Sequence, residues 1–445
     1  MGLTAIRRAL AGDIRTLLGH GTFVGDISWN VVSLSLLGIS GLALNVIIGR
    51  YYGPGDLGVF NLVFSLYIFY SQLTSLGIYF SVLKHIAEFS PDPARSHVIL
   101  TAALLLALGA ATVMTAVAYA LAGILNPLFS SSKVSMAWIC ILPGLWCYSM
   151  NKVLMAALNG WRRMRAYAFF QGLRYVLMVL FLIGLVAAGA EGVYLPLLVS
   201  GAELAVFGLL AGYTMLHFRP VFSRETIAWM NEHARFGLKS FLSGTMAELT
   251  SRIDVLMLGL LTTERTVGIY SMAALTAEGL AMLAFAVRDN VNPILTQYLS
   301  QGKRERLREL LRRGVRLFSV FMAAAGLAAA AVYPGFIRVL VGDPSFLESW
   351  QPFVVILVGL TLASGFLPFN MILVQAGRPA LHTLLKAAIL ATAIALNAAL
   401  IPLFHMMGAA AATSLLYVAA ALYLVYALQR VLGLRVFQSE IGVRP

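Results

Sequence analysis

The stretch VIIGRYYGPGDLGVFNL at residues 46–62 aligns without gaps with a second stretch, LMLGLLTTERTVGIYSM, at residues 256–272. The alignment pairs Gly58 with Gly268, and an aliphatic and an aromatic residue follow each of these two glycines. Each stretch joins two long apolar segments, so each is typical of a short loop between two membrane spans. The matched glycines predict an internal repeat of two halves that have the same orientation in the membrane.

The composition places the whole chain in a membrane. Of its 445 residues, 60% are hydrophobic and only 11% are charged, and the mean hydropathy is +0.85. Soluble domains average about 45–50% apolar and about 25% charged residues, so this composition excludes a soluble domain and a disordered chain. At roughly 20 residues for each span, the chain holds about twelve helices and little else. We therefore predict an all-α polytopic membrane protein.

Apolar runs bounded by charge, Gly or Pro define twelve expected spans, six on each side of a polar break near residues 219–235. The expected spans are at residues 27–49, 57–81, 98–125, 134–157, 166–188, 193–216, 236–261, 267–295, 315–337, 351–375, 380–401 and 407–428. The expected domains are an N-terminal amphipathic surface helix (1–26), a six-helix bundle (27–216), a cytoplasmic linker (217–235), a second six-helix bundle (236–429) and a cytoplasmic tail (430–445).

The net charge of +13 is explained by topology. In this segmentation one set of loops carries only Arg50, Lys133, Arg265 and Arg338, and the opposite loops and both termini carry most other cations. The positive-inside rule therefore predicts that both termini are cytoplasmic. The membrane that we expect is a bacterial-type inner (plasma) membrane. No basic domain with interleaved aromatic residues lies outside the apolar segments, so we expect no nucleic acid partner.

Three stretches resemble a known family: GRYYGPGDLGVFNL (49–62), LNGWRRMRAYAFFQ (158–171) and SRIDVLMLGLLTTERTVGIYSMA (251–273). They are similar to Wzx-type polysaccharide-biosynthesis flippases of the multidrug/oligosaccharidyl-lipid/polysaccharide exporter (MOP) superfamily. The resemblance implies two six-helix bundles that form a V around a central cavity. It also implies that a polyprenyl-diphosphate-linked oligosaccharide is moved to the outer leaflet by alternating access. A polymerase or glycan-assembly complex is an implied partner, and we expect the chain to work as a monomer.

Ionisable residues inside membrane spans are unfavourable and usually mark a polar pathway. We predict that the cations there line a route for a diphosphate, which Arg binds in bidentate fashion and Lys as a point charge: Lys152, Arg174, Lys239, Arg252, Arg288 and Lys386. For the four that lie in the cytoplasmic third of their spans, the alternative is snorkelling to the headgroups. For Arg252 the alternative is a pair with Glu248 one helical turn away.

Acids inside the spans predict a second role. Glu203 and Glu278 fall near the middle of their spans, and Asp254 falls near the outer end of the seventh. A desolvated carboxylate binds a proton more readily, so these residues are candidates for coupling to an ion gradient. The alternative is a paired acid that fixes helix packing, or for Asp254 a helix cap. Intramembrane amides, including Asn370 and Asn397, either bind sugar hydroxyls or join helices.

No P-loop, Rossmann glycine pattern or HExxH sequence occurs in the chain, and we expect no cofactor, no metal site and no enzymatic activity. A drug or cation antiporter of the MATE type is the alternative within the same fold, and it would favour an acidic cavity. A membrane-embedded glycosyltransferase or polymerase is a weaker alternative. Such an enzyme needs catalytic carboxylates and a large outer loop, whereas the outer loops expected here are short.

Overall fold

The computed structural model describes residues 21–433, and for residues 21–37, 242–244, 247 and 432 it describes the backbone alone. Most of the expected surface helix (1–26) and tail (430–445) therefore lies outside the described residues. Every regular element within 21–433 is helical, which confirms the all-α prediction.

The first six spans come from eight helical elements. These are α2 (Gly21–Ser75), α3 (Ile78–Glu88), α4 (Pro93–Ala120), α5 (Ala122–Leu128), α6 (Val134–Gly160), α7 (Met164–Ala187), η1 (Gly192–Tyr194) and α8 (Leu197–Met215). Helix α2 contributes two spans because the chain turns at Gly53, where φ is 77°. Glycine has no Cβ and adopts this left-handed conformation without strain, and Pro54 then begins the second span.

The second six spans follow the same plan. Their elements are α9 (Glu225–Thr250), α10 (Ile253–Leu261), α11 (Glu264–Ser300), α12 (Arg304–Phe336), η2 (Ile337–Val341), η3 (Pro344–Ser349), α13 (Trp350–Ser364), η4 (Leu367–Phe369), α14 (Ile372–Gln375) and α15 (Pro379–Leu432). Helix α15 also contributes two spans, since its backbone turns at His405, where φ is 50°. The twelve-helix architecture is as predicted.

The seventh span differs from the prediction, which had one continuous helix over residues 236–261. In the structure α9 ends at Thr250 and α10 begins at Ile253, with Arg252 in a non-helical conformation (φ −131°, ψ 0°) between them. Nine helices among the residues whose side chains are described are long and apolar enough to cross a membrane. The prediction of one continuous helix is wrong at the α9–α10 break.

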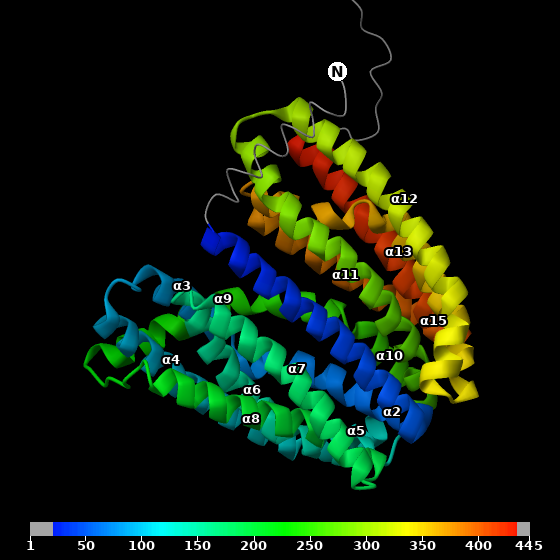
Figure 1. Ribbon diagram of the computed structural model, residues 1–445, viewed down its shortest axis with the longest axis horizontal. Helices are drawn as coiled ribbons and strands as arrows, with labels where there is room; N and C mark the ends of the chain where they lie inside the picture. Colours follow the sequence, from blue (N-terminus) through cyan, green and yellow to red (C-terminus); the bar gives the residue numbers. More distant parts are fainter. Residues whose placement is uncertain (1–20, 434–445) are drawn as a thin grey trace, which may run out of the picture.

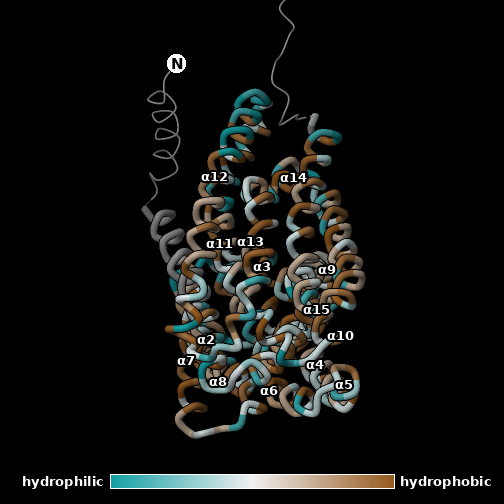
Figure 2. The backbone as a smooth tube through the Cα atoms, turned by 90° about the vertical axis from the view of Figure 1, so that its right-hand side faces the viewer, coloured by the Kyte–Doolittle hydropathy of each residue, from teal (hydrophilic) through white to brown (hydrophobic). Residues whose placement is uncertain are grey.

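The helices form two sets that meet at one end (Figure 1). The N-terminal set contains α2–α8 and the C-terminal set contains α10–α15, with α2 lying between α7 and α11. The sets meet where α5, α10 and the turn of α2 lie, which we call the converging end. They separate toward the opposite end, which carries the start of α12 and the loop between α3 and α4 (Figure 1). In Figure 2 the start of α12 is hydrophilic and extends past the neighbouring helices.

At the converging end, the two glycines matched by the sequence repeat pack against each other. A Cβ atom built on Gly58 would lie 1.7 Å from the carbonyl oxygen of Glu264, and one on Gly268 would lie 1.9 Å from that of Pro54. Pro54 and Glu264 are themselves aligned in the repeat. The backbones of α2 and α11 therefore meet directly, and we call this the glycine contact.

A second aligned pair repeats the same relation. A Cβ on Gly49 would lie 3.3 Å from the Met272 side chain, and one on Gly259 would lie 2.6 Å from Leu62. Leu62 and Met272 are aligned as well. Reciprocal contacts of this kind arise when two similar halves are related by a two-fold axis. The internal repeat read from the sequence is therefore present in the packing.

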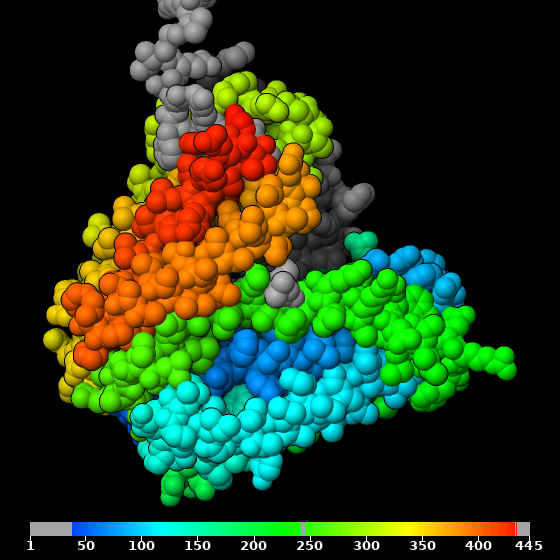
Figure 3. All heavy atoms as spheres, turned by 180° about the vertical axis from the view of Figure 1, so that it is seen from behind, coloured from blue at the N-terminus to red at the C-terminus, as the bar shows by residue number. Residues whose placement is uncertain are grey.

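Helix α9 crosses from one set to the other (Figure 3). Its first part packs on α3 and α4, where a Cβ on Gly237 would lie 2.6 Å from the carbonyl oxygen of Leu76. The buried His233 ring lies 2.8 Å from Ser81 Oγ through Nδ1 and 3.0 Å from the Ile99 carbonyl oxygen through Nε2. The start of α9 is thus fixed to the N-terminal set, and its end leads into α10 of the C-terminal set.

Candidate functional site

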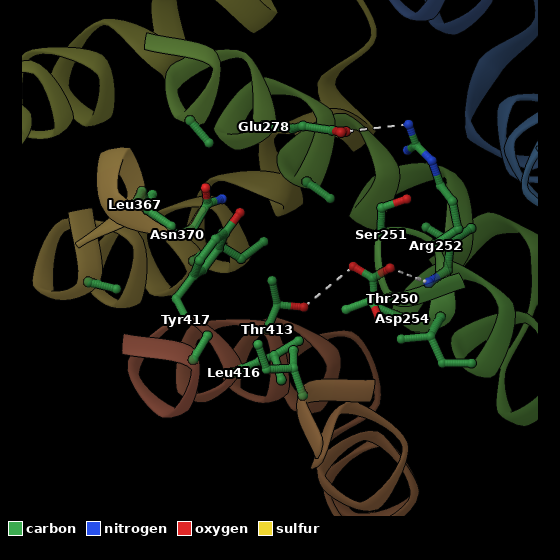
Figure 4. A pocket seen from close by; sticks show the side chains of 18 of the residues that line it. Thr250, Ser251, Arg252, Asp254, Glu278, Leu367, Asn370, Thr413, Leu416 and Tyr417 are labelled. Atoms are coloured by element: carbon green, nitrogen blue, oxygen red, sulfur yellow. Dashed lines mark hydrogen bonds and ion pairs between the residues drawn. The ribbon is translucent and has the colours of Figure 1, made fainter. Parts of the chain in front are cut away.

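A cavity of about 320 Å³ lies in the C-terminal set (Figure 4). Its walls come from the α9–α10 junction, α11, α13, η4 and α15, and Asn61 and Ser65 of α2 also line it. Its volume falls within the roughly 300–1,000 Å³ that is usual for small-molecule sites. Four of the predicted charged residues line it: Arg252, Asp254, Glu278 and Lys386. The cavity is therefore the principal site at which the predicted residues meet.

Arg252 enters the cavity because the seventh span is broken there. Its Nη2 lies 3.5 Å from Oε2 of Glu278 on α11, and the two side chains are 18% and 35% exposed. The Arg252 Nε is buried and has no hydrogen-bond partner among the described residues. The structure thus pairs Arg252 with Glu278 across two elements, whereas the alternative read from the sequence was a pair with Glu248 on a continuous helix.

Asp254 is held by three donors near the start of α10. The Tyr270 hydroxyl donates to Oδ2 at 2.5 Å, the Thr413 hydroxyl approaches the same oxygen at 3.4 Å, and the Val255 backbone N–H donates to Oδ1 at 2.8 Å. Tyr270 and Thr413 also lie within 3.0 Å of each other. Figure 4 shows Asp254 and Thr413 facing each other across the cavity wall. A carboxylate with this many donors keeps a fixed orientation.

Lys386 presents a cation to the cavity from the first part of α15. No ion pair or hydrogen bond joins its ammonium group to any residue whose side chain is described. Its electrostatic neighbours are His382, one turn earlier on α15, and Arg288 of α11. Arg288 pairs with the adjacent Asp289 at 2.9 Å and lies over the Phe285 ring. Lys386 is therefore an uncompensated cation at this end of the cavity, beside an Arg288 that Asp289 already pairs.

Several polar atoms on the cavity wall lack a partner within the described part of the chain. The side chains of Asn397 and Ser271 are each 1% exposed, and Asn397 Oδ1 and Ser271 Oγ make no hydrogen bond. The Oδ1 atom of Asn370 is also buried and makes no hydrogen bond. Buried polar groups are normally hydrogen-bonded, so unpaired ones that line a cavity indicate a polar occupant. Sequence reasoning singled out both asparagines but missed Ser271, Thr413 and Tyr417, because a hydroxyl in an apolar run is common.

Arg174 and Glu203 lie in the N-terminal set, outside the cavity. Arg174 Nε on α7 is 2.7 Å from Oε1 of Glu203 on α8, whose side chain is fully buried. The Asn151 side-chain amide donates to the other carboxylate oxygen at 2.9 Å and to the Glu203 carbonyl oxygen at 3.0 Å. The arrangement joins α6, α7 and α8. It corresponds to the packing alternative that the sequence left open for Glu203.

The remaining two predicted cations lie apart from the cavity. Lys152 on α6 donates to Ser71 Oγ at 3.3 Å and lies about 5 Å from the ring centres of Tyr79 and Tyr148. Such contacts stabilise an ammonium group in a water-poor region. Lys239 is exposed on α9. The structure thus brings Arg252 and Lys386 to one cavity and leaves Lys152, Arg174 and Lys239 elsewhere, with Arg288 beside Lys386.

Helices in two sets, with a charged cavity in the C-terminal set, define a polytopic α-helical membrane protein. A family model described as "Polysaccharide biosynthesis protein" matches residues 44–354. The chain belongs to this polysaccharide biosynthesis protein family, which confirms the family resemblance read from the sequence.

Individual relatives agree with this assignment. The chain is 24% identical over 386 residues to a probable flippase, AglR, of Haloferax volcanii, covering 84% of this chain and 77% of the relative. Its fold resembles the lipid II flippase MurJ in an inward closed conformation, with a TM-score of 0.75 at 12% identity over 91% of this chain and 87% of that one. An inward-facing MATE-family transporter of the MOP superfamily follows at 0.69 and 14% identity, covering 92% and 99%.

Proposed function

We propose that the protein flips a polyprenyl-diphosphate-linked oligosaccharide from the cytoplasmic to the outer leaflet by alternating access between its two helix sets. One observation carries the proposal: a chain of the polysaccharide biosynthesis family has a cavity that contains Lys386, a cation with no partner among the described side chains. A cation of this kind suits a phosphate, which supplies the missing negative charge and strong acceptor oxygens. The protein acts as a transporter and not as an enzyme.

The proposed route starts at the separated end of the two sets. Arg288 and Lys386 collect the diphosphate, and Arg252 lies further along the same cavity. Lys152 lies on α6 of the N-terminal set, and Lys239 lies on α9. Both contact the substrate when the sets move. Arg174 serves the route indirectly, since its guanidinium group is bound by Glu203 and faces the Tyr148 ring at 4.8 Å.

The proposal includes an orientation. Both termini face the cytoplasm of a bacterial-type inner membrane, so the separated end is cytoplasmic and the converging end is external. The distribution of positive charge in the loops supports this orientation. The protein works as a monomer beside a polymerase or glycan-assembly complex.

Transport is proposed to be coupled to an ion gradient through Asp254 and Glu278, which line the cavity beside Arg252. The two carboxylates interact electrostatically, so a change in the charge of one affects the ionisation of the other. Glu203 is a weaker candidate because it is fully buried against Arg174. Flipping that responds to neither an imposed pH gradient nor a sodium gradient would rule out this part of the proposal.

The proposal is tested by flipping in reconstituted liposomes. Lipid-linked glycan extracted from the source cells is incorporated, and its appearance in the outer leaflet is measured by its accessibility to a lectin. Hydrogen bonds to charged groups contribute about 1.5–3 kcal/mol, so we expect Lys386→Gln to reduce flipping about tenfold or more. The control is Arg306→Gln, which removes an exposed cation of α12 remote from the cavity. Equal flipping by wild-type and empty liposomes would refute the function.

Drug or cation antiport is the second candidate, and the two cavity acids Asp254 and Glu278 favour it. A cationic drug would take the place of Arg252 beside Glu278. Liposomes that accumulate a lipophilic cation such as tetraphenylphosphonium in exchange for protons, and do not flip lipid-linked glycan, would support this candidate over the first.

A further inference from the structure

The polar groups of the cavity differ in kind from one end to the other. Lys386 lies toward the separated end of α15, and Glu278 and Asn397 lie further toward the converging end. Eleven residues of α15 separate Lys386 from Asn397, which corresponds to about 16 Å along the helix axis. One phosphate group cannot contact both ends, so the cavity has room for two chemically different parts of one ligand.

The cavity lining toward the converging end contains a group of hydrogen-bond acceptors. This group comprises the carboxylates of Asp254 and Glu278, the unpaired carbonyl oxygens of Asn370 and Asn397, and the hydroxyl of Ser271. We call these five residues the deep subsite. Arg252 supplies donors here: Glu278 engages its Nη2, and its Nε has no partner among the described residues. An ionised phosphate has acceptor oxygens only, so it cannot satisfy the carboxylate and amide oxygens, whereas the hydroxyls of a sugar donate hydrogen bonds to them.

The group toward the separated end has the opposite character. Lys386 has no partner among the described side chains, Arg288 is its cationic neighbour, and the buried Nδ1 of His382 makes no hydrogen bond to a described residue. We call Lys386 together with these two neighbours, which lie beside the cavity and not in its lining, the entry subsite. An anion with several acceptor oxygens stabilises an ammonium group that has no acid partner.

We propose that the cavity binds its ligand in a fixed direction, with the diphosphate in the entry subsite and the first sugars in the deep subsite. The inference rests on the proposed function and assigns the two parts of its substrate. It also gives Asn397 and Ser271 a role as specificity-determining residues for a hydroxylated glycan. In this arrangement the glycan precedes the diphosphate toward the converging end.

Two ligands and two variants test the two subsites independently. The ligands are the native lipid-linked glycan from source cells and the polyprenyl diphosphate left after mild acid removes its sugars. The variants are Lys386→Gln and Asn397→Leu, with Arg306→Gln as the matched surface control. Affinities of the purified full chain in detergent are measured by isothermal titration calorimetry, and thermal melting verifies that each variant is folded. Asn370→Leu replaces Asn397→Leu if the latter does not fold.

We expect Lys386→Gln to weaken both ligands about tenfold or more, because both carry the diphosphate. We expect Asn397→Leu to weaken the lipid-linked glycan about threefold or more and to leave the polyprenyl diphosphate unchanged. Equal weakening of both ligands by Asn397→Leu would overturn the assignment, and so would an unchanged affinity of Lys386→Gln for polyprenyl diphosphate. A wild-type protein that binds neither ligand would instead refute the proposed function.

Discussion

The buried ion pair of Arg174 and Glu203 is the most constrained charge arrangement in the N-terminal set. Its side chains are 11% and 0% exposed, and Asn151 completes the hydrogen bonding of the carboxylate. Burying two charges is unfavourable unless each stays paired, so the two residues depend on each other. The pair ties α7 to α8 and holds three neighbouring helices in register.

Removing one member of this pair should destabilise the protein strongly. Glu203→Gln leaves the guanidinium group of Arg174 buried without its counter-charge, which costs about 3–5 kcal/mol. The free energy of unfolding, measured by denaturant titration in mixed micelles, reports the loss.

An exposed pair provides the control for this experiment. Glu305→Gln breaks the pair of Arg308 with Glu305 at 3.0 Å on α12, where the carboxylate side chain is 78% exposed. Surface pairs contribute about 0–1 kcal/mol, so this change should have little effect. A Glu203→Gln protein as stable as wild type would show that the buried pair is not needed for folding.

The sequence predicted which charges lie in the membrane but not how they pair. Glu248 precedes Arg252 by four residues, the spacing of a helical pair, yet Glu278 is the partner of Arg252 because α9 ends at Thr250. Asp254 meets Thr413, which is 159 positions away along the chain. Helical periodicity links residues three or four apart, so it carries no information about contacts of this kind.

Among the elements, α9 has a distinctive contact with α3 and α4. The Nε2 of His233 donates to the Ile99 carbonyl oxygen, so its Nδ1 accepts from the Ser81 hydroxyl. Burial lowers the pKa of His233 to about 4, and His85 and Glu232 are the titratable groups that act on it. The neutral ring is therefore part of the folded structure at neutral pH.

This contact should make stability depend on pH. Between pH 6.5 and about 4 the unfolded chain binds a proton at His233 and the folded chain does not. The contribution of the neutral His233 ring to the free energy of unfolding is therefore complete above pH 6.5 and is lost as pH falls toward 4. From pH 7 to pH 5 we expect the wild type to lose about 2 kcal/mol more than His233→Gln, which retains a donor and an acceptor.

Denaturant titration at the two pH values measures this difference. His217→Gln is the control, because that histidine is exposed and its replacement should leave the pH dependence intact. If His233→Gln and the wild type lost the same stability, the histidine would have no part in fixing α9.

The glycine repeat is the element that the sequence predicted best. Gly58 and Gly268 were paired by alignment alone, and they meet in the structure with almost no space between the backbones. Such close approach excludes a Cβ, so the contact requires glycine and can be predicted from the sequence. The helix break at Arg252 cannot be predicted in this way, since neither Gly nor Pro occurs there.

For the whole molecule, hydrogen bonds join the two sets at the converging end. The Ser131 hydroxyl of the N-terminal set donates to Glu264 Oε2 of the C-terminal set at 2.6 Å. Arg50 Nη1 of the N-terminal set donates to the Leu340 carbonyl oxygen of the C-terminal set at 3.2 Å. Alternating access requires these contacts to break when the converging end opens.

A cross-link between the sets should therefore stop transport. Ser131→Cys with Glu264→Cys, joined by a short bifunctional thiol reagent, should reduce flipping to the level of empty liposomes. Cleaving a reducible linker should restore it. Both native cysteines, Cys140 and Cys147, are buried and should not compete for the reagent.

A cross-link within one set provides the matched control. Lys133 Nζ lies 2.6 Å from Asp56 Oδ1, and this hydrogen bond raises the pKa of Lys133. Both residues belong to the N-terminal set at the same end of the molecule. Lys133→Cys with Asp56→Cys, joined by the same reagent, should leave flipping intact. Full transport by the protein cross-linked at residues 131 and 264 would contradict a mechanism in which the two sets separate.

The glycine contact has a consequence for how the two sets close. Where α2 passes α11 at Gly58 and Gly268, peptide groups meet with no side chain between them. Under the proposed alternating access, closing the converging end therefore brings main chain against main chain, with no rotamer to reorder and no void to fill. Two identical small residues provide this contact at no cost in side-chain entropy.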